Sequence, residues 1–211
     1  MALLPQIAET VSKIDLETIP LARREMLQPL IEYIREKVSK GLAVRLNFIC
    51  THNSRRSHLA QVWAQAMAYH FSFDRVFTYS GGTESTALYP MVVETLRRSG
   101  FQVETIAERQ NPVYAIKHSA NESPIIGFSK RWDDDFNPQS EFAAILTCSQ
   151  ADENCPFIRG AESRIALNYE DPKRFDNSPV KAQSYAERSM QIAAEMFYVY
   201  KIVGEELGRK N

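Results

Sequence analysis

The feature that most constrains this fold is an alternation of short apolar runs with amphipathic stretches. The runs have the length and composition of buried strands, and the stretches between them have the apolar spacing of helices. The four runs are AVRLNFIC at 43–50, RVFTYSGG at 75–82, EFAAILTC at 141–148 and SRIALNYE at 163–170. Strands that alternate with helices are typical of a parallel sheet covered on both faces. The sequence therefore predicts an α/β fold with a four-stranded parallel sheet flanked by helices.

The remaining segments are arranged around this core. Residues 1–42 are expected to form an N-terminal helical extension, in which Pro29 leaves open whether there are two helices or one kinked helix. Residues 43–211 are expected to form the α/β domain, with an insertion at about 107–140 that is rich in turn residues. The insertion is expected to hold a hairpin of VYAIKHS and PIIGFSK. The helices expected in the domain lie at 57–71, 89–100 and 184–208.

The composition restricts the class of protein. The chain has 211 residues, of which 44% are apolar, and a formal net charge of −1. A charge so close to zero gives no electrostatic argument for a nucleic acid or an anionic membrane as partner. No apolar run reaches the roughly 20 residues of a membrane-spanning helix, and the N-terminus lacks the basic segment of a signal peptide. We therefore expect a cytoplasmic protein, whose odd number of cysteines, three, points to catalysis or metal binding.

The first apolar run ends at Cys50, and five residues separate this cysteine from Arg56. In open α/β sheets ligands bind at the carboxyl ends of strands, and a loop that turns into a helix can aim its amides at one anion. Arg56 would complete such a cradle with a planar fork, and a hydrogen bond from Ser57 would stabilise a Cys50 thiolate nucleophile. The expected oxyanion-binding residues are Thr51, His52, Asn53, Ser54, Arg55, Arg56 and Ser57.

The other two cysteines, Cys148 and Cys155, follow the third run. Their spacing is too wide for the usual structural zinc pair, which leaves two buried structural thiols or a redox pair. A disulfide needs Cα atoms within about 6.8 Å, whereas seven residues of regular helix span roughly 10 Å. The segment between them must therefore loop or unwind if they are to pair.

The segment FICTHNSRRSHLA resembles the phosphate-binding loop of the low-molecular-weight protein tyrosine phosphatase family, which includes the thioredoxin-coupled arsenate reductases. The similarity covers about residues 43–205 apart from the insertion, and YSGGTE resembles the family's segment after the second strand. His52 stands where the family usually has glycine, so we expect a narrower loop or an uncommon backbone angle there. The resemblance also implies that Asp171, before Pro172, is a general acid.

The resemblance implies a relay among the three cysteines. Cys50 would form an adduct with arsenate, Cys148 would attack Cys50 and release arsenite, and a Cys148–Cys155 disulfide would pass to a thioredoxin-like reductant. No cofactor is implied. The glutamate that holds potassium in some arsenate reductases of the family is replaced by Gln61, so no metal is expected.

Two other functions remain open from the sequence. One is a phosphatase that acts on phosphotyrosine or another phosphomonoester through a Cys50 phosphoenzyme, although Lys173 and Arg55 replace an aromatic residue and a cysteine common in the tyrosine phosphatases. The other is a non-catalytic oxyanion or phosphoprotein sensor. The N-terminal helices are in either case a candidate surface for a homo-oligomer.

Overall fold

The computed structural model describes residues 2–154 and 157–209. Its central sheet has four parallel strands, as the sequence predicts, and their order is β2-β1-β6-β7. The strands of this sheet are β1 (Val44–Cys50), β2 (Val76–Gly82), β6 (Phe142–Leu146) and β7 (Ala161–Ala166). The predicted boundaries hold for β1 and for the end of β2, but β6 ends two residues and β7 four residues before the predicted ends.

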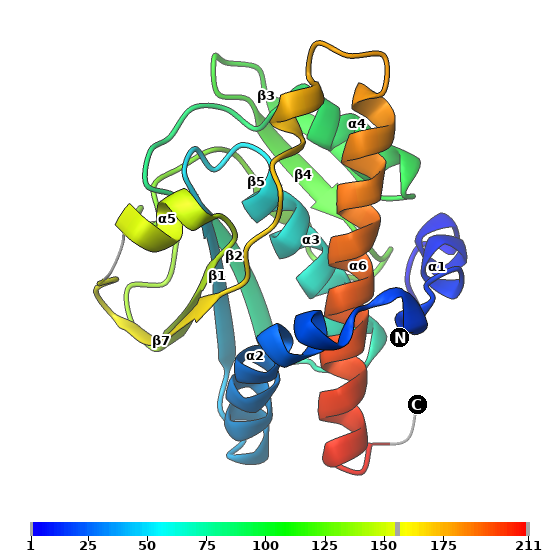
Figure 1. Cartoon of the computed structure of the whole chain (residues 1–211), viewed down its shortest axis with the longest axis vertical. Helices are drawn as coiled ribbons and strands as arrows, with labels where there is room; N and C mark the ends of the chain where they lie inside the picture. Colours follow the sequence, from blue (N-terminus) through cyan, green and yellow to red (C-terminus); the bar gives the residue numbers. More distant parts are fainter. Residues whose placement is uncertain (1, 155–156, 210–211) are drawn as a thin grey trace.

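Long helices cover one face of this sheet (Figure 1). The helices of the chain are α1 (Pro5–Ser12), α2 (Leu21–Ser39), α3 (Arg56–His70), α4 (Pro90–Arg98), α5 (Ser149–Asn154) and α6 (Lys181–Glu206), with short 3-10 turns η1 (Leu16–Thr18) and η2 (Pro172–Phe175). Among the described residues, no helix is both long and apolar enough to cross a membrane.

Alternation along the strands divides the interior into two cores. Leu46 and Phe48 of β1 face the larger core with α2, α3 and α6, whereas Ile49 and Cys50 belong to a smaller cluster on the other face. The smaller cluster includes Cys148 and is partly covered by α5. The cysteines of β1 and of the loop after β6 therefore share one apolar environment.

The insertion folds as a second sheet of antiparallel strands β3 (Gln102–Ala107), β4 (Val113–Lys117) and β5 (Ile125–Gly127). The hairpin expected from the sequence is confirmed, since it corresponds to β4 and β5. The first strand, β3, lies before the insertion's predicted start at 107 and was not expected. Its pairing partner is β4, so the insertion continues a sheet that begins directly after α4.

The N-terminal extension packs against the larger core. Pro29 lies inside one continuous helix, α2, which settles the open alternative. Pro29 has no N–H to donate to the carbonyl of the preceding turn. That carbonyl lies on the exposed side of α2, where water can donate a hydrogen bond to it. On the opposite side, Leu27, Leu30 and Ile34 are fully buried, and each contributes about 1.5–3 kcal/mol of hydrophobic stabilisation.

The fold also shows where two histidines lie. His70 contacts Phe71 and Phe197 through its ring, as expected of a structural residue. His118 is buried against Tyr69, but neither of its ring nitrogens has a hydrogen-bond partner among the described residues. Burial lowers the pKa of His118 to about 4.

Candidate active site

The candidate site lies at the carboxyl edge of the parallel sheet. Cys50, the last residue of β1, is in register with Gly82 of β2. On the other side of β1, Ile49 pairs with Leu146, and Cys148 comes two residues later. Parallel pairing thus brings the ends of three strands to one edge, where α/β proteins bind ligands.

The loop from Cys50 to Arg55 directs its backbone carbonyls outward. Each of its six carbonyls accepts a hydrogen bond from a group away from the loop's centre. The donors include the amides of Thr83, Glu84 and Tyr89, which bond Cys50, Thr51 and Ser54 at 2.8 to 3.1 Å. In a trans peptide the C=O and the following N–H point in opposite directions, so the amides of residues 51–56 face the inside of the loop. This is the arrangement of an anion-binding nest at a helix N-terminus.

Cys50 is held at the base of this loop by a directional chain of hydrogen bonds. Its Sγ lies 3.1 Å from Ser57 Oγ, and Asn53 Nδ2 donates to the same oxygen at 2.9 Å. Because the Asn53 amide nitrogen can only donate, the Ser57 hydroxyl hydrogen is free to point at sulfur. The side chain of Cys50 is 4% exposed, so a thiolate here would depend on such donors.

The strained position of the loop is Asn53, not His52. Asn53 has φ +43°, and His52 is absent from the residues with positive φ. The expectation of an uncommon angle at His52 is therefore wrong. The His52 side chain points toward solvent, and its Nδ1 lies 3.3 Å from Glu84 Oε2, so it leaves the loop open. Asparagine tolerates the left-handed region better than most residues.

A buried histidine, His58, supports the loop from behind, with the buried Lys130 nearby. His58 Nε2 lies 3.0 Å from the Asn53 carbonyl, which fixes the proton on Nε2, while Nδ1 lies 3.3 Å from Ser80 Oγ. Complete burial lowers the pKa of His58 to about 3, and the charge of Lys130 contributes to the shift. Burial also lowers the pKa of Lys130 to about 8. His58 therefore stays neutral and serves as a fixed donor.

Sequence reasoning missed the part of the insertion that holds the loop. Ser129 Oγ donates to the His52 carbonyl at 2.9 Å, and the Lys130 amide donates to Asn53 Oδ1 at 2.8 Å. Asn111 fixes Ser129 with two hydrogen bonds of 2.7 and 3.0 Å. No local pattern in the segment IGFSK (126–130) marks such a role, since the partners of Ser129 and Lys130 lie more than 70 residues away.

The role of Gly82, in contrast, could have been predicted from the sequence, because this glycine lies in the segment YSGGTE. A Cβ on Gly82 would lie 2.7 Å from Asn53 N and 2.8 Å from Thr51 O. These contacts are shorter than real Cβ atoms show, so the loop can pack on β2 only over glycine.

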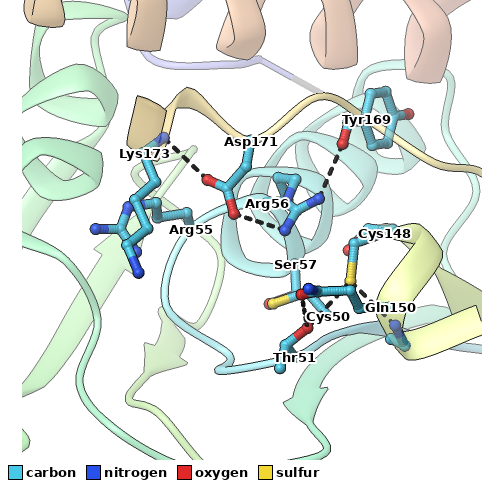
Figure 2. A network of polar contacts seen from close by, with 12 residues as sticks. Cys50, Thr51, Arg55, Arg56, Ser57, Cys148, Gln150, Tyr169, Asp171 and Lys173 are labelled. Atoms are coloured by element: carbon cyan, nitrogen blue, oxygen red, sulfur yellow. Dashed lines mark hydrogen bonds and ion pairs between the residues drawn. The ribbon is translucent and has the colours of Figure 1, made fainter. Parts of the chain in front are cut away.

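Arg56 and Asp171 form the opposite side of the site (Figure 2). Arg56 Nη2 donates to Asp171 Oδ2 at 2.6 Å, and Nη1 donates to the Tyr169 carbonyl at 2.9 Å. Its Nε is buried and has no partner among the described residues. Asp171 Oδ1 also accepts from the Lys173 amide at 3.0 Å, which begins η2 directly after the carboxylate. The proline in between is buried and fixes this turn.

Arg55 differs from the other predicted oxyanion residues. Its Nε donates to Tyr185 Oη at 2.6 Å, its Nη2 pairs with Asp176 at 2.7 Å, and its guanidinium stacks on Tyr89 at 4.0 Å. These contacts direct the side chain toward α6, so Arg55 anchors the loop. The cavity at the loop has a volume of about 240 Å³ and is lined by Cys50, Thr51, His52, Ser54, Arg55, Arg56, Gln150, Asp171 and Lys173.

Cys148 lies on the side of the cavity beyond Thr51. Its Sγ is 3.5 Å from Thr51 Oγ1, which also lies 3.4 Å from Gln150 Oε1 (Figure 2). Cys148 is a free thiol and 2% exposed. It borders a second hollow that shares Arg56, Gln150 and Asp171 with the first. One side chain, Thr51, therefore stands beside both cysteines.

The segment after Cys148 is helical. The Asp152 amide donates to the Cys148 carbonyl at 3.0 Å and the Ala151 amide to its Sγ at 3.4 Å, which begins α5. For a disulfide between Cys148 and Cys155 to form, this segment would have to loop or unwind. In that case α5 would have to open before the disulfide forms. Cys155 lies outside the described residues. Within them, no cluster of histidine, cysteine and acidic residues could hold a metal ion, and Gln61 donates to the Thr78 carbonyl at 3.0 Å.

Comparison with known proteins gives distant relatives. No family model matches the chain. It is 28% identical over 125 residues to arsenate reductase 2 of Staphylococcus epidermidis, which covers 59% of this chain and 76% of that protein. It is 25% identical over 159 residues to the arsenate reductase of Bacillus licheniformis, covering 75% of this chain and 95% of the relative.

Two solved structures share the fold. A low-molecular-weight phosphotyrosine phosphatase from Vibrio cholerae superposes with a TM-score of 0.53 at 11% identity, covering 79% of this chain and 99% of the other. A mutant of YwlE from Bacillus subtilis superposes with a TM-score of 0.52 at 14% identity, covering 76% and 98%. The two solved chains are covered almost completely, whereas this chain is covered only in part. The segments that this protein has in addition therefore lie mainly outside the shared fold.

Proposed function

We propose that this chain, a distant homologue of the arsenate reductases with the low-molecular-weight phosphatase fold, reduces arsenate to arsenite through Cys50, Cys148 and Cys155. The observation that carries the proposal is the position of Cys148. A phosphatase has no need for a second thiol at the site, whereas here Cys148 Sγ lies 3.5 Å from the hydroxyl of Thr51, the residue next to Cys50. Both cysteines belong to one apolar cluster.

The first step is the capture of arsenate in the loop. The inward amides and Arg56 Nε bind the oxyanion, and Arg56 Nη2 exchanges Asp171 for a second arsenate oxygen. The released Asp171 carboxylate takes up a proton from solvent and donates it to an arsenate hydroxyl, which leaves as water. The Cys50 thiolate forms a bond to arsenic at the same centre, so the product is a thiol–arsenate adduct in which arsenic is still As(V).

The second step transfers electrons. The Cys148 thiolate attacks Cys50 Sγ, the sulfur–arsenic bond breaks, and its electron pair stays on arsenic. Arsenite leaves as As(III), and the two thiols have become a Cys50–Cys148 disulfide. Cys155 then attacks Cys148 and releases the Cys50 thiolate. A dithiol protein of the thioredoxin type reduces the resulting Cys148–Cys155 disulfide, which restores the enzyme and accounts for both electrons.

A comparison of two cysteine variants tests the relay. Arsenite release is measured with thioredoxin and its reductase, beside hydrolysis of an aryl phosphate by the same samples. Cys148→Ser should release no arsenite and keep its hydrolysis within about threefold, because its thiol is not part of the phosphoryl-transfer step. Cys155→Ser should release one arsenite per enzyme molecule and then stop. Multiple-turnover reduction by Cys148→Ser would show that the relay is wrong.

Phosphomonoester hydrolysis is the second candidate, favoured by the contact of Asp171 with Arg56 at 2.6 Å. The same loop would bind a phosphoryl group, Cys50 would form the phosphoenzyme, and Asp171 would protonate the leaving oxygen. Hydrolysis by wild type without any arsenate reduction would support this function instead. Binding of arsenate with neither reaction would support an oxyanion sensor.

A further inference from the structure

The N-terminal extension reaches the site through one arginine. Arg23, near the start of α2, donates from Nε to Glu195 Oε1 at 2.7 Å and from Nη2 to Glu195 Oε2 at 2.9 Å. Its third nitrogen, Nη1, donates to the Asn168 carbonyl at 3.0 Å. The fork of this arginine therefore joins three parts of the fold, namely α2, α6 and the segment after β7. Figure 1 shows the extension crossing in front of α6.

Glu195 is the centre of this network. Its side chain is 1% exposed, and besides Arg23 it accepts from Tyr169 Oη at 2.7 Å and from Gln191 Nε2 at 2.9 Å. A buried carboxylate needs such partners, and charge-assisted bonds of this kind are short and directional. The guanidinium of Arg23 also lies over the Tyr169 ring, 4.6 Å from its centroid. Burial raises the pKa of Tyr169, and the nearby Glu195 raises it further, so its hydroxyl stays a donor.

The segment held by this network carries the groups that face the substrate. Residues 167–171 lie between β7 and η2 and belong to no helix or strand. The Tyr169 carbonyl bonds Arg56 Nη1, and two residues later Asp171 bonds Arg56 Nη2. Because this segment has no regular structure, the position of these groups depends on the hydrogen bonds that neighbouring residues make to the segment. Arg23 bonds the segment twice, directly at Asn168 and through Glu195 at Tyr169.

We propose that Arg23 is a positioning residue for the oxyanion site, which holds the Tyr169 carbonyl and the Asp171 carboxylate in place against Arg56. The N-terminal extension is then a working part of the site rather than a covering of α6. The part of the inference that concerns Asp171 rests on the proposed function, whereas the part that concerns Arg56 requires only that the loop binds an oxyanion.

The matched control is the neighbouring arginine. Arg24 lies on the same helix and is also partly buried, but it bonds the carbonyls of Ile19 and Leu16 within the extension and lies over Tyr198. Arg24→Met therefore disturbs the packing of the extension without touching the segment 167–171. Arg23→Met leaves Glu195 buried with a missing partner, which threatens folding. The double variant Arg23→Met with Glu195→Gln removes both charges and keeps an acceptor for Tyr169.

The first readout is phosphate binding, which needs no turnover. Phosphate protects Cys50 from iodoacetamide, and modification of the Cys50 peptide is followed by mass spectrometry. The concentration for half-protection should rise at least about fivefold in Arg23→Met and in the double variant, because a displaced Tyr169 carbonyl lets the Arg56 fork turn. Arg24→Met should stay within about twofold of wild type.

The second readout is the dependence on the leaving group. Phenyl phosphate needs a proton for its leaving oxygen, and dinitrophenyl phosphate does not. Loss of Arg23 should lower kcat about 10- to 100-fold for phenyl phosphate and less than about fivefold for dinitrophenyl phosphate. A role in folding alone would move both esters equally.

These outcomes are distinguishable. If the double variant folds and matches Arg24→Met in phosphate protection and in leaving-group dependence, Arg23 is not a positioning residue. If wild type hydrolyses neither ester and reduces no arsenate, the proposed function fails, and phosphate protection alone still decides the role of Arg23.

Discussion

The two cysteine regions of the site are built in opposite ways. The loop of residues 50–57 has all of its carbonyls from Cys50 to Arg55 bonded outward, by groups from α3, from the segment after β2 and from the insertion. The segment 149–154 is a short helix, α5, whose start bonds Cys148. It is tied to the rest of the protein by the buried Ala151, by the contact of Gln150 with Thr51 and by the ion pair of Asp152 with Arg164. The first region is fixed by hydrogen bonds to its backbone along its whole length, and the second by a few side-chain contacts.

This difference matches the chemistry that we propose for each region. Binding and transition-state stabilisation of an oxyanion need dipoles that are fixed in advance. Formation of a disulfide across six intervening residues needs a segment that can change shape, and a helix of only six residues is marginal by itself. The fold thus places a rigid binding loop beside a cysteine whose own segment can open at low cost.

The largest effect is expected from the rigid region. Arg56→Lys removes the planar fork that holds the Tyr169 carbonyl and faces the oxyanion, so kcat/KM for arsenate reduction and for hydrolysis should both fall about 10²–10³-fold. Arg55→Lys is the matched control, because its guanidinium bonds Tyr185 and Asp176 instead. Steady-state kinetics measures both. An Arg55→Lys variant that loses more activity than Arg56→Lys would contradict the assignment of the anion-binding arginine.

The rigidity of the loop itself should appear as stability. Asn53→Ala loses the bonds to Ser57 and to the Lys130 amide and replaces asparagine at φ +43° with a residue that tolerates the left-handed region less well, for a total of about 3 kcal/mol of unfolding free energy. Asn53→Gly loses the same bonds without the strain, for about 2 kcal/mol. Urea denaturation separates the two.

The comparison region provides the control for this prediction. Ser149→Ala, at the start of α5, should change the unfolding free energy by less than about 0.5 kcal/mol. Equal losses at Asn53 and Ser149 would mean that the loop is no more constrained than α5.

The architecture of the loop at Cys50 could be predicted from the sequence, because it depends on the local order of apolar and polar residues. The apolar run before Cys50, the polar loop and the amphipathic helix after it identify a strand, a turn and a helix whose order fixes the sheet edge. The contact of Cys50 with Ser57 follows from that geometry and is confirmed at 3.1 Å. The roles of Cys50, Arg56, Asp171, Cys148 and Cys155 stay predictions.

The remaining features depend on long-range contacts that a local pattern does not contain. β6 ends at Leu146, and the Thr147 amide and hydroxyl both bond the Ile49 carbonyl, although the apolar run continues to Cys148. α5 is an exception, because it forms through local bonds from the amides of Ala151 and Asp152 to Cys148, which the polar run SQADEN did not indicate. Support of the loop by Ser129 and Lys130 arises from pairing across more than 70 residues.

Acid should weaken the rigid region selectively. The unfolded chain protonates His58 below its ordinary pKa near 6.5, whereas the folded protein resists protonation until about pH 3. The unfolded state therefore binds more protons between these values, so the contribution is full above pH 6.5 and is lost as the pH falls. At pH 5 the loss is about 2 kcal/mol.

A comparison of urea unfolding at pH 7 and pH 5 measures the summed loss of His58 and His118, because the buried His118 contributes a similar slope. His58→Gln should reduce this summed loss by about half. Residues 148–154 contain no histidine, so variants in α5 should keep the full slope. An unchanged slope in His58→Gln would mean that His58 is not buried as a neutral donor.

The smallest effect is expected in the segment that must open. Asp152→Asn removes the ion pair with Arg164, whose partners are both partly exposed, so α5 should lose less than about 1 kcal/mol. In the proposed relay, α5 opens before the disulfide passes from Cys50 to Cys155. If that transfer limits turnover, the multiple-turnover rate of arsenite release should rise by up to about threefold. Single-turnover release by a Cys155→Ser background should not change, since it needs only Cys148. A slower multiple turnover in Asp152→Asn would mean that the ion pair keeps Cys148 in place for attack, and α5 would then belong with the rigid half of the site.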